Sequence, residues 1–147
     1  EYVDIGMSYV QSNINGALGV SQLKKLETMN KERRTIAEFY INELSGIPSL
    51  EFLRITQDCE HNWHIFGILV PAKEKYWIMD ALRAEGVMSN VHYTPLHRNK
   101  YYNKLSSDKN MPGSMEFFER LLRLPIYPSL TEKERTTIVN VIRKIFL

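Results

Sequence analysis

The sequence of 147 residues contains a single cysteine, Cys59, which excludes an internal disulfide and a zinc site built from several cysteines. One thiol favours a reducing compartment, so we expect a cytoplasmic protein. No apolar run approaches the roughly 20 residues that cross a bilayer, and the acidic start, residues 1–7, does not resemble a signal peptide. We therefore expect no membrane association. The sequence also lacks an initiator methionine, which favours a piece of a longer protein.

An excess of charge of either sign is also missing. Lys and Arg total 19 and Asp and Glu total 17, which gives a net charge of +2. Two surplus charges without a basic stripe do not suit a phosphate backbone, so we expect no nucleic-acid partner. The sequence has no phosphate-binding glycine loop, no Ser-His-Asp order and no paired-carboxylate motif. Composition therefore identifies no reaction class.

Hydrophobic residues make up 44% of the chain, enough for the core of one soluble domain over residues 1–147. Their spacing is helical from Ser12, a potential N-cap, to Leu44. Gly16 and Gly19 lie in the first turns, where they favour a break or a bend. We therefore expect a long first helix, and these glycines leave room for a break or a bend in its first turns.

The rest of the chain alternates between extended and helical patterns. The last helix opens with the capping box Thr131-x-x-Glu134. This order predicts an α+β fold in which helices cover a short antiparallel or mixed sheet. The expected helices span residues 75–85, 114–122 and 131–146, the expected strands span 49–55, 61–70 and 87–93, and a short extended piece spans 124–127.

The histidines are the first candidates for chemistry. Cys59, His61 and His64 form a Cys-x-His-x-x-His pattern that is compatible with metal ligands. His61 and His64 lie three residues apart on an expected strand, however, so their side chains would point to opposite faces of the sheet. We therefore expect no metal site.

A second candidate is the segment 90–97, where an expected strand ends and a long polar loop begins. Loops on a rigid scaffold commonly carry binding groups. His92 and Tyr93 can donate to phosphate or sugar oxygens there, and a histidine can transfer a proton. The alternative is that both side chains simply pack on the core, and spacing alone favours it.

Residues 6–9 and Ser12 form a third candidate, because they precede the long helix. Backbone amides and hydroxyls at the start of a helix can hold an anion such as a phosphate. Capping of the helix by Ser12 is the simpler interpretation.

Taken together, several segments resemble the C-terminal portion of the DegT/DnrJ/EryC1/StrS family of sugar aminotransferases, with the branch of dTDP-4-amino-4,6-dideoxygalactose transaminases as the nearest match. Their order and spacing match the family over essentially the whole chain. The matching segments are residues 2–9 with 12–23, 61–66, 86–97 and 119–131.

The resemblance implies a fold-type I enzyme that uses pyridoxal phosphate (PLP) to move an amino group from glutamate to a keto carbon of a nucleotide-linked sugar. Such reactions serve cell-surface polysaccharide or amino-sugar biosynthesis. In the family, a large N-terminal domain carries the lysine that binds PLP. This implies that the present chain is the small domain, with residues 1–45 as the inter-domain segment and long helix. We expect it to bind no PLP by itself and to be inactive alone.

A lysine that binds PLP must be buried beside the cofactor. Five lysines of this sequence are instead expected at the surfaces or edges of helices. They are Lys24, Lys25, Lys31, Lys73 and Lys75.

The resemblance also implies site residues, because the family's active site lies at the interface of a homodimer. The stretch before the long helix reaches the cofactor phosphate of the partner subunit, which corresponds to Ser8, Tyr9 and Ser12 here. The commoner pattern has Asn at the Ser8 position and Arg at the Val10 position. Serine can still donate a hydrogen bond, whereas valine cannot.

The loop near the sugar substrate corresponds to His92 and Tyr93, with His97 as its second histidine. The alternative function is a non-catalytic module that binds sugar nucleotides or another protein and derives from the same fold. A coding region that supplies the PLP-binding lysine would distinguish the enzyme from the module.

Overall fold

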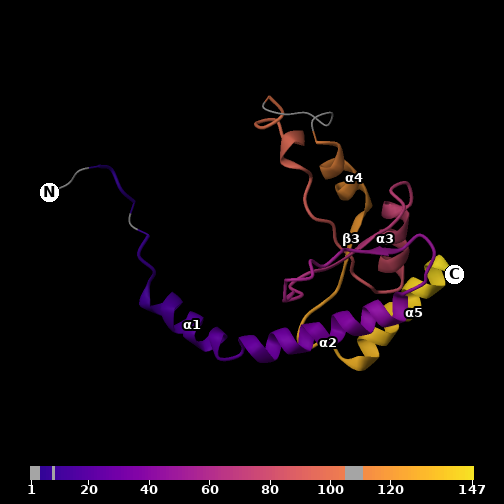
Figure 1. The fold of residues 1–147 in the computed structure, drawn as a ribbon, viewed down its shortest axis with the longest axis horizontal. Helices are drawn as coiled ribbons and strands as arrows, with labels where there is room; N and C mark the ends of the chain where they lie inside the picture. Colours follow the sequence, from indigo (N-terminus) through magenta and orange to yellow (C-terminus); the bar gives the residue numbers. More distant parts are fainter. Residues whose placement is uncertain (1–3, 8, 105–110) are drawn as a thin grey trace.

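The computed structural model describes residues 4–7, 9–104 and 111–147 (Figure 1). Over these ranges, five α-helices and a three-stranded antiparallel sheet form an α+β fold, as predicted. None of the helices described is both long and apolar enough to cross a membrane. The helices are α1 (Asn13–Leu23), α2 (Leu26–Leu44), α3 (Lys75–Ala84), η1 (Leu96–Arg98, a 3-10 turn), α4 (Pro112–Arg120) and α5 (Glu132–Phe146), and the strands are β1 (Glu51–Phe52), β2 (Phe66–Leu69) and β3 (Leu121–Leu124).

The long first helix is broken, but not at its glycines. Ser12 caps α1, since its hydroxyl accepts a hydrogen bond from the Asn15 amide at 3.2 Å. The break falls at Lys24 and Lys25, where the Lys25 amide bonds to the Gln22 carbonyl at 3.0 Å and tightens the last turn. Neither Gly16 nor Gly19 causes it. In Figure 1, α1 extends away from the folded body, and it buries no residue.

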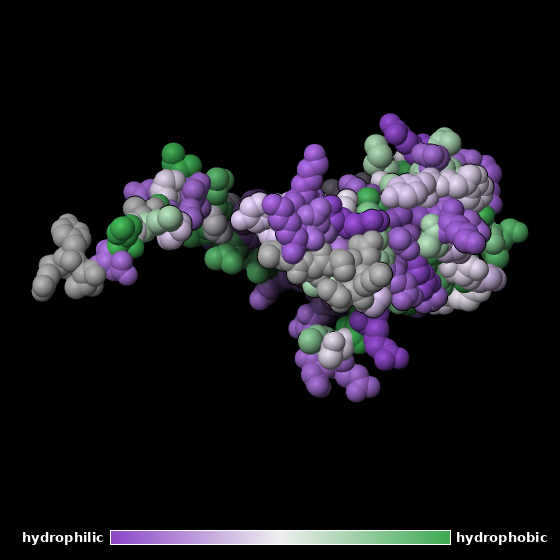
Figure 2. Space-filling model, turned by 90° about the horizontal axis from the view of Figure 1, so that it is seen from above, coloured by the Kyte–Doolittle hydropathy of each residue, from purple (hydrophilic) through white to green (hydrophobic). Residues whose placement is uncertain are grey.

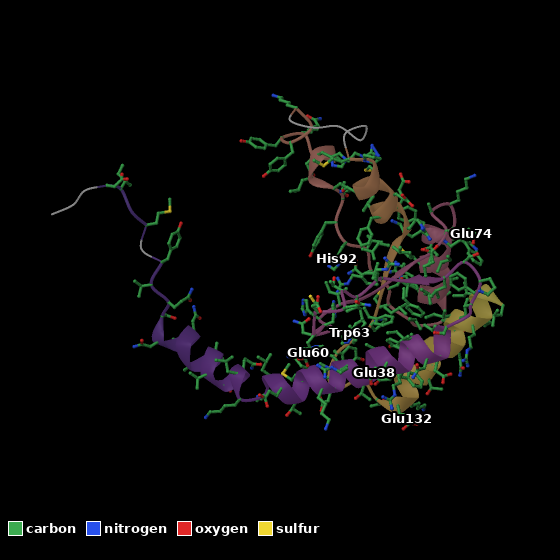
Figure 3. All side chains as sticks on the ribbon, in the orientation of Figure 1. Glu38, Glu60, Trp63, Glu74, His92 and Glu132 are labelled. Atoms are coloured by element: carbon green, nitrogen blue, oxygen red, sulfur yellow. The ribbon has the colours of Figure 1, made fainter. Side chains whose placement is uncertain are left out.

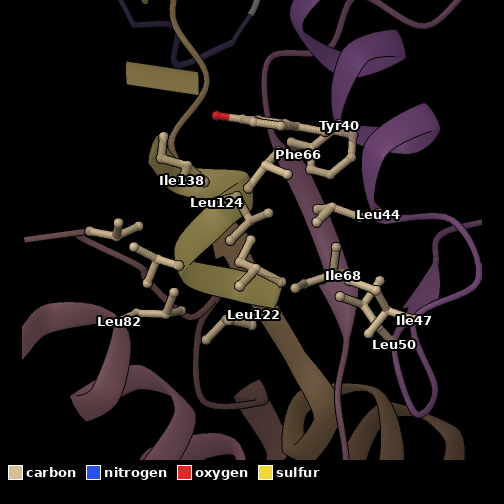
Figure 4. Close-up of a cluster of buried hydrophobic side chains, with 14 of the residues drawn as sticks. Tyr40, Leu44, Ile47, Leu50, Phe66, Ile68, Leu82, Leu122, Leu124 and Ile138 are labelled. Atoms are coloured by element: carbon tan, nitrogen blue, oxygen red, sulfur yellow. The ribbon is translucent and has the colours of Figure 1, made fainter. Parts of the chain in front are cut away.

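The second helix, α2, contributes four buried residues to the core. Its buried residues, Ile36, Ala37, Tyr40 and Leu44, recur at helical spacing and face the core. Figure 1 shows α2 and α5 below the sheet and α4 above it. Figure 4 shows how side chains of α2, β2, β3, α3 and α5 meet in one apolar cluster, which includes Phe66, Ile68, Leu82, Leu122, Leu124 and Ile138.

The sheet has β2 at its centre, with β1 and β3 antiparallel on either side. Phe66 pairs with Leu124 and Leu69 pairs with Leu121. Gly67 lies where a Cβ would come within 2.9 Å of Leu53 Cδ1 and 3.0 Å of Leu121 Cδ1. The absence of a side chain at Gly67 therefore lets its neighbours close over the sheet.

The predicted third strand, residues 87–93, is wrong. Only Asn90 makes a bridge, to Arg123, and the sheet's third strand is β3 instead. The side chain of Asn90 accepts a hydrogen bond from the Val91 amide at 2.8 Å, which takes one donor from any continuing ladder. The predicted helix 114–122 ends at Arg120, because its last two residues belong to β3.

The predicted strand 61–70 is shortened to Phe66–Leu69. Before it, Trp63 takes a positive φ of 51°. The Trp63 amide donates to His61 Nδ1 at 2.9 Å, and the His64 amide donates to Asn62 Oδ1 at 3.1 Å. These two local bonds turn the chain, so His61 and His64 lie outside the strand.

Candidate functional site

The centre of the candidate site is His92, which lies two residues after the Asn90 bridge. Its ring packs edge to face on Tyr93, with 4.9 Å between centroids. Its Nε2 lies 3.0 Å from Nη1 of Arg123 on β3. In Figure 3, His92 and Trp63 both lie at the edge of the body on the side toward which the N-terminal segment extends.

Burial and neighbouring groups favour the neutral form of His92. Burial of the ring lowers its pKa, and electrostatic repulsion from Arg123 and His64 lowers it further. A neutral imidazole has one acceptor and one donor nitrogen. Near neutral pH, His92 can therefore donate a hydrogen bond to a ligand oxygen but is not a cation.

The two other residues of the predicted sugar loop have opposite environments. Tyr93 is 81% exposed, so its hydroxyl is available to a ligand. His97 lies in η1 and is only 6% exposed. The structure thus brings His92 and Tyr93 together at the surface and places the His97 side chain in the interior.

The predicted phosphate group of residues lies on the N-terminal segment. Ser8 falls outside the described residues. Tyr9 is exposed, and its hydroxyl bonds to Met7 Sδ at 3.0 Å. Ser12 acts as the N-cap of α1, in agreement with the simpler interpretation of this residue. Within this chain, α1 carries the segment away from the body that holds His92 (Figure 3).

Lys75 is the first residue of α3, so it lies at a helix edge as expected, but its side chain is not at the surface. Lys75 is 1% exposed, and its ammonium donates to the Phe118 carbonyl at 2.5 Å. The ammonium also lies 5.0 Å and 4.5 Å from the ring centroids of Tyr76 and Phe118. Burial lowers the pKa of Lys75, and Glu119 opposes this effect. The ammonium of Lys75 on α3 therefore already bonds to Phe118 on α4, and Lys75 does not suit a PLP-binding role.

The histidines near Cys59 do not gather around an ion. The His61 ring packs on Trp63 with 4.5 Å between centroids, and Cys59 is exposed. Within the ranges that the structure describes, no group of three or more His, Cys, Asp or Glu side chains is suited to hold a metal.

Sequence reasoning missed Arg123. The signal was present, because Arg123 is the charged residue in the otherwise apolar run Leu121–Leu124. A half-buried arginine in a core strand requires a partner, and the structure identifies His92.

Comparisons with known proteins agree with this structure. The model of the DegT/DnrJ/EryC1/StrS aminotransferase family matches residues 1–143. The spore coat polysaccharide biosynthesis protein SpsC of Bacillus subtilis is 31% identical over 140 residues, which are 90% of this chain and 36% of SpsC.

Two solved structures are also similar. A DegT/DnrJ/EryC1/StrS aminotransferase from Brucella abortus has a TM-score of 0.89 and 26% identity, and the match covers 99% of this chain and 39% of that one. Helicobacter pylori PseC, an aminotransferase involved in the biosynthesis of pseudoaminic acid, has a TM-score of 0.87 and 25% identity, over 99% of this chain and 40% of that one. This chain thus spans about two-fifths of the length of the proteins it matches.

Proposed function

Because this chain belongs to the DegT/DnrJ/EryC1/StrS aminotransferase family, we propose that it forms the small C-terminal domain of a PLP-dependent sugar aminotransferase. The reaction transfers an amino group from glutamate to a keto carbon of a nucleotide-linked sugar in the cytoplasm. The family match over residues 1–143 carries this proposal. The names of SpsC and PseC support a product used in polysaccharide or acidic-sugar biosynthesis.

The chemistry of amino transfer comes from PLP, which stabilises negative charge on the carbon that gains or loses the amine. Lys75 donates to the Phe118 carbonyl and does not suit the role of the PLP-binding lysine. The resemblance to the family implies that this lysine belongs to a large N-terminal domain. This chain contributes the sugar side of the site. The neutral His92 and the exposed Tyr93 donate hydrogen bonds to oxygens of the substrate.

The N-terminal segment and α1 supply the contact with the rest of the enzyme. Their apolar side chains are largely exposed, including Ile14 at 74%, Leu18 at 58% and Leu23 at 68%. Figure 2 shows green, hydrophobic surface on the arm that extends from the body. An apolar helix without buried residues gains stability when another surface covers it. In this proposal the large domain and the second subunit of a homodimer cover it, with Ser8, Tyr9 and Ser12 next to the partner's cofactor phosphate.

The test uses the complete enzyme, PLP, glutamate and a panel of keto-sugar nucleotides, with 2-oxoglutarate as the measured product. We expect His92→Ala to lose about 100-fold or more in kcat while the absorbance of bound PLP is unchanged. Tyr93→Phe should raise KM, and Tyr76→Phe, on the distant surface of α3, should change neither constant. Unchanged turnover in His92→Ala would remove His92 from the site.

The size of the natural product separates this proposal from the binding module. An antibody against this chain should detect a protein more than twice 17.2 kDa in an extract of the source cells. A product of 17.2 kDa that binds sugar nucleotides in calorimetry would instead support the module.

A further inference from the structure

We propose that Arg123 is a positioning residue, which holds His92 with Nε2 as a hydrogen-bond acceptor and with Nδ1–H as the donor presented to substrate. This inference rests on the proposed function for the role of His92, but its geometric part stands on the structure alone. The bond that carries it joins Arg123 Nη1 to His92 Nε2 at 3.0 Å.

The position of Arg123 is fixed by its backbone. Arg123 lies opposite Gly67 in the β2–β3 register. It also bonds in both directions to Asn90, at 2.8 Å through its amide and at 3.2 Å through its carbonyl. Because Asn90 precedes His92 by two residues, the same bridge brings the imidazole within reach of the guanidinium. The pair is therefore built into the edge of the sheet rather than formed by two mobile surface groups.

The direction of this hydrogen bond follows from the chemistry of arginine. A guanidinium carries five N–H donors and no acceptor, so His92 Nε2 must accept. A neutral imidazole that accepts at Nε2 carries its proton on Nδ1. In the neutral tautomer with the proton on Nε2, two N–H groups would face each other. In the imidazolium cation, two positive charges would face each other as well. The contact thus selects one tautomer of a neutral ring.

The surrounding charges also favour the neutral form of His92. The groups that face His92 are Arg123 on β3, His64 from the turn before β2 and the Tyr93 ring on its own segment. Within the described residues, no carboxylate forms an ion pair with Arg123, and its buried Nε has no hydrogen-bond partner. Among the residues that the structure describes, no carboxylate therefore offsets the charge of Arg123, and this charge acts on His92 directly.

This arrangement has a consequence for substrate binding. A ring that is held at Nε2 cannot rotate to exchange its two nitrogens, so the donor at Nδ1 keeps one direction. A fixed donor suits a hydroxyl or phosphate oxygen of a nucleotide-linked sugar. A misplaced donor costs up to about 100-fold in rate, even when the residue itself remains.

The experiment is nitrogen NMR of histidine side chains in the complete enzyme, with the His92 signals assigned by comparison with His92→Gln. In the wild-type protein we expect the Nδ1–H tautomer at neutral pH. Arg123→Met removes both the charge and the donor, and should give mixed tautomers and a raised pKa of His92. Arg123→Gln keeps a donor without the charge, and should retain more of the tautomer than Arg123→Met.

The kinetic readout accompanies the spectra. We expect Arg123→Met to lower kcat by about 10- to 100-fold with PLP binding unchanged, and Arg123→Gln to recover part of that loss. Arg83→Met, on the exposed face of α3, is the control for loss of one arginine and should match the wild type.

Two results would overturn the inference. One is a wild-type spectrum with the proton on Nε2, which needs no variant to fold. The other is a folded Arg123→Met protein in which His92 titrates as in the wild type. If the tautomer is as expected but His92→Ala retains full activity, the positioning by Arg123 stands and the proposed substrate role of His92 fails.

Discussion

The hydroxyl of Tyr40 on α2 donates a hydrogen bond to the backbone carbonyl of Pro125, at 2.9 Å, directly after β3. Tyr40 is fully buried, and its ring packs edge to face on Phe66 with 5.1 Å between centroids. One side chain thus ties the main helix to the segment that leaves the sheet, 85 residues later in the sequence.

Removal of this hydroxyl should destabilise the domain. In Tyr40→Phe the ring packing remains, but the Pro125 carbonyl loses its partner, which costs about 1–3 kcal/mol. Urea denaturation measures the change in the free energy of unfolding. Tyr76→Phe, at a position that is 62% exposed, is the control and should remain within about 0.5 kcal/mol of the wild type. Equal stability of the two variants would contradict a structural role for this bond.

Gly67 should tolerate no side chain without a cost. Its φ is not in the left-handed region, so the penalty of Gly67→Ala is steric and arises from Leu53 and Leu121. Both contacts are ends of flexible side chains that can move aside, so their displacement should cost about 1 kcal/mol, at the low end of overpacking. Gly113→Ala, in the first turn of α4 with open space around it, should be neutral or slightly stabilising. Thermal unfolding of both variants compares the two sites.

The capping box of α5 makes stability depend on pH. Hydrogen bonds from the hydroxyl and the amide of Thr131 hold the pKa of Glu134 below its ordinary value of 4.5. Because the folded state favours the ionised carboxylate, this stabilisation is present above the ordinary pKa and is lost as the pH falls through the lowered value. The unfolding free energy of Glu134→Gln should therefore fall less than that of the wild type between about pH 5 and pH 3.

The matched control is Glu132→Gln, which removes a charge from the same turn but not from the capping box. Chemical denaturation at a series of pH values gives the comparison. A Glu132→Gln curve that is as flat as that of Glu134→Gln would assign the effect to the charge of the first turn rather than to the bonds with Thr131.

The limits of sequence reasoning are visible at particular residues. The fold class followed from hydrophobic periodicity and the capping box of α5 from the Thr131-x-x-Glu134 motif, and both were confirmed. Leu121 and Leu122 were assigned to a helix because a short apolar run fits either structure, and only pairing with β2 decides between them. Asn90 ended a predicted strand through its own side chain, which propensity does not describe.

Contacts between residues that are distant in sequence also explain why the sequence did not predict the environments of Lys75 and Arg123. Each depends on a partner that is distant in sequence, since Lys75 bonds to Phe118 and Arg123 bonds to His92. Charge patterns along one helix or strand carry no information about such contacts. A charged residue within an apolar run is nevertheless a usable signal, because its burial requires a partner.

The exposed apolar face of α1 should cause self-association of this 147-residue chain when it is studied alone. We expect a particle larger than a monomer in size-exclusion chromatography. Leu18→Lys should shift it toward the monomer without lowering the melting temperature, because α1 buries no residue. Gln22→Lys adds the same charge to the same helix without removing an apolar side chain, and should leave the elution volume unchanged. A monomeric wild-type chain would contradict the idea that α1 is a surface for another protein domain, whereas restored association in Leu18→Met would tie the effect to the apolar contact itself.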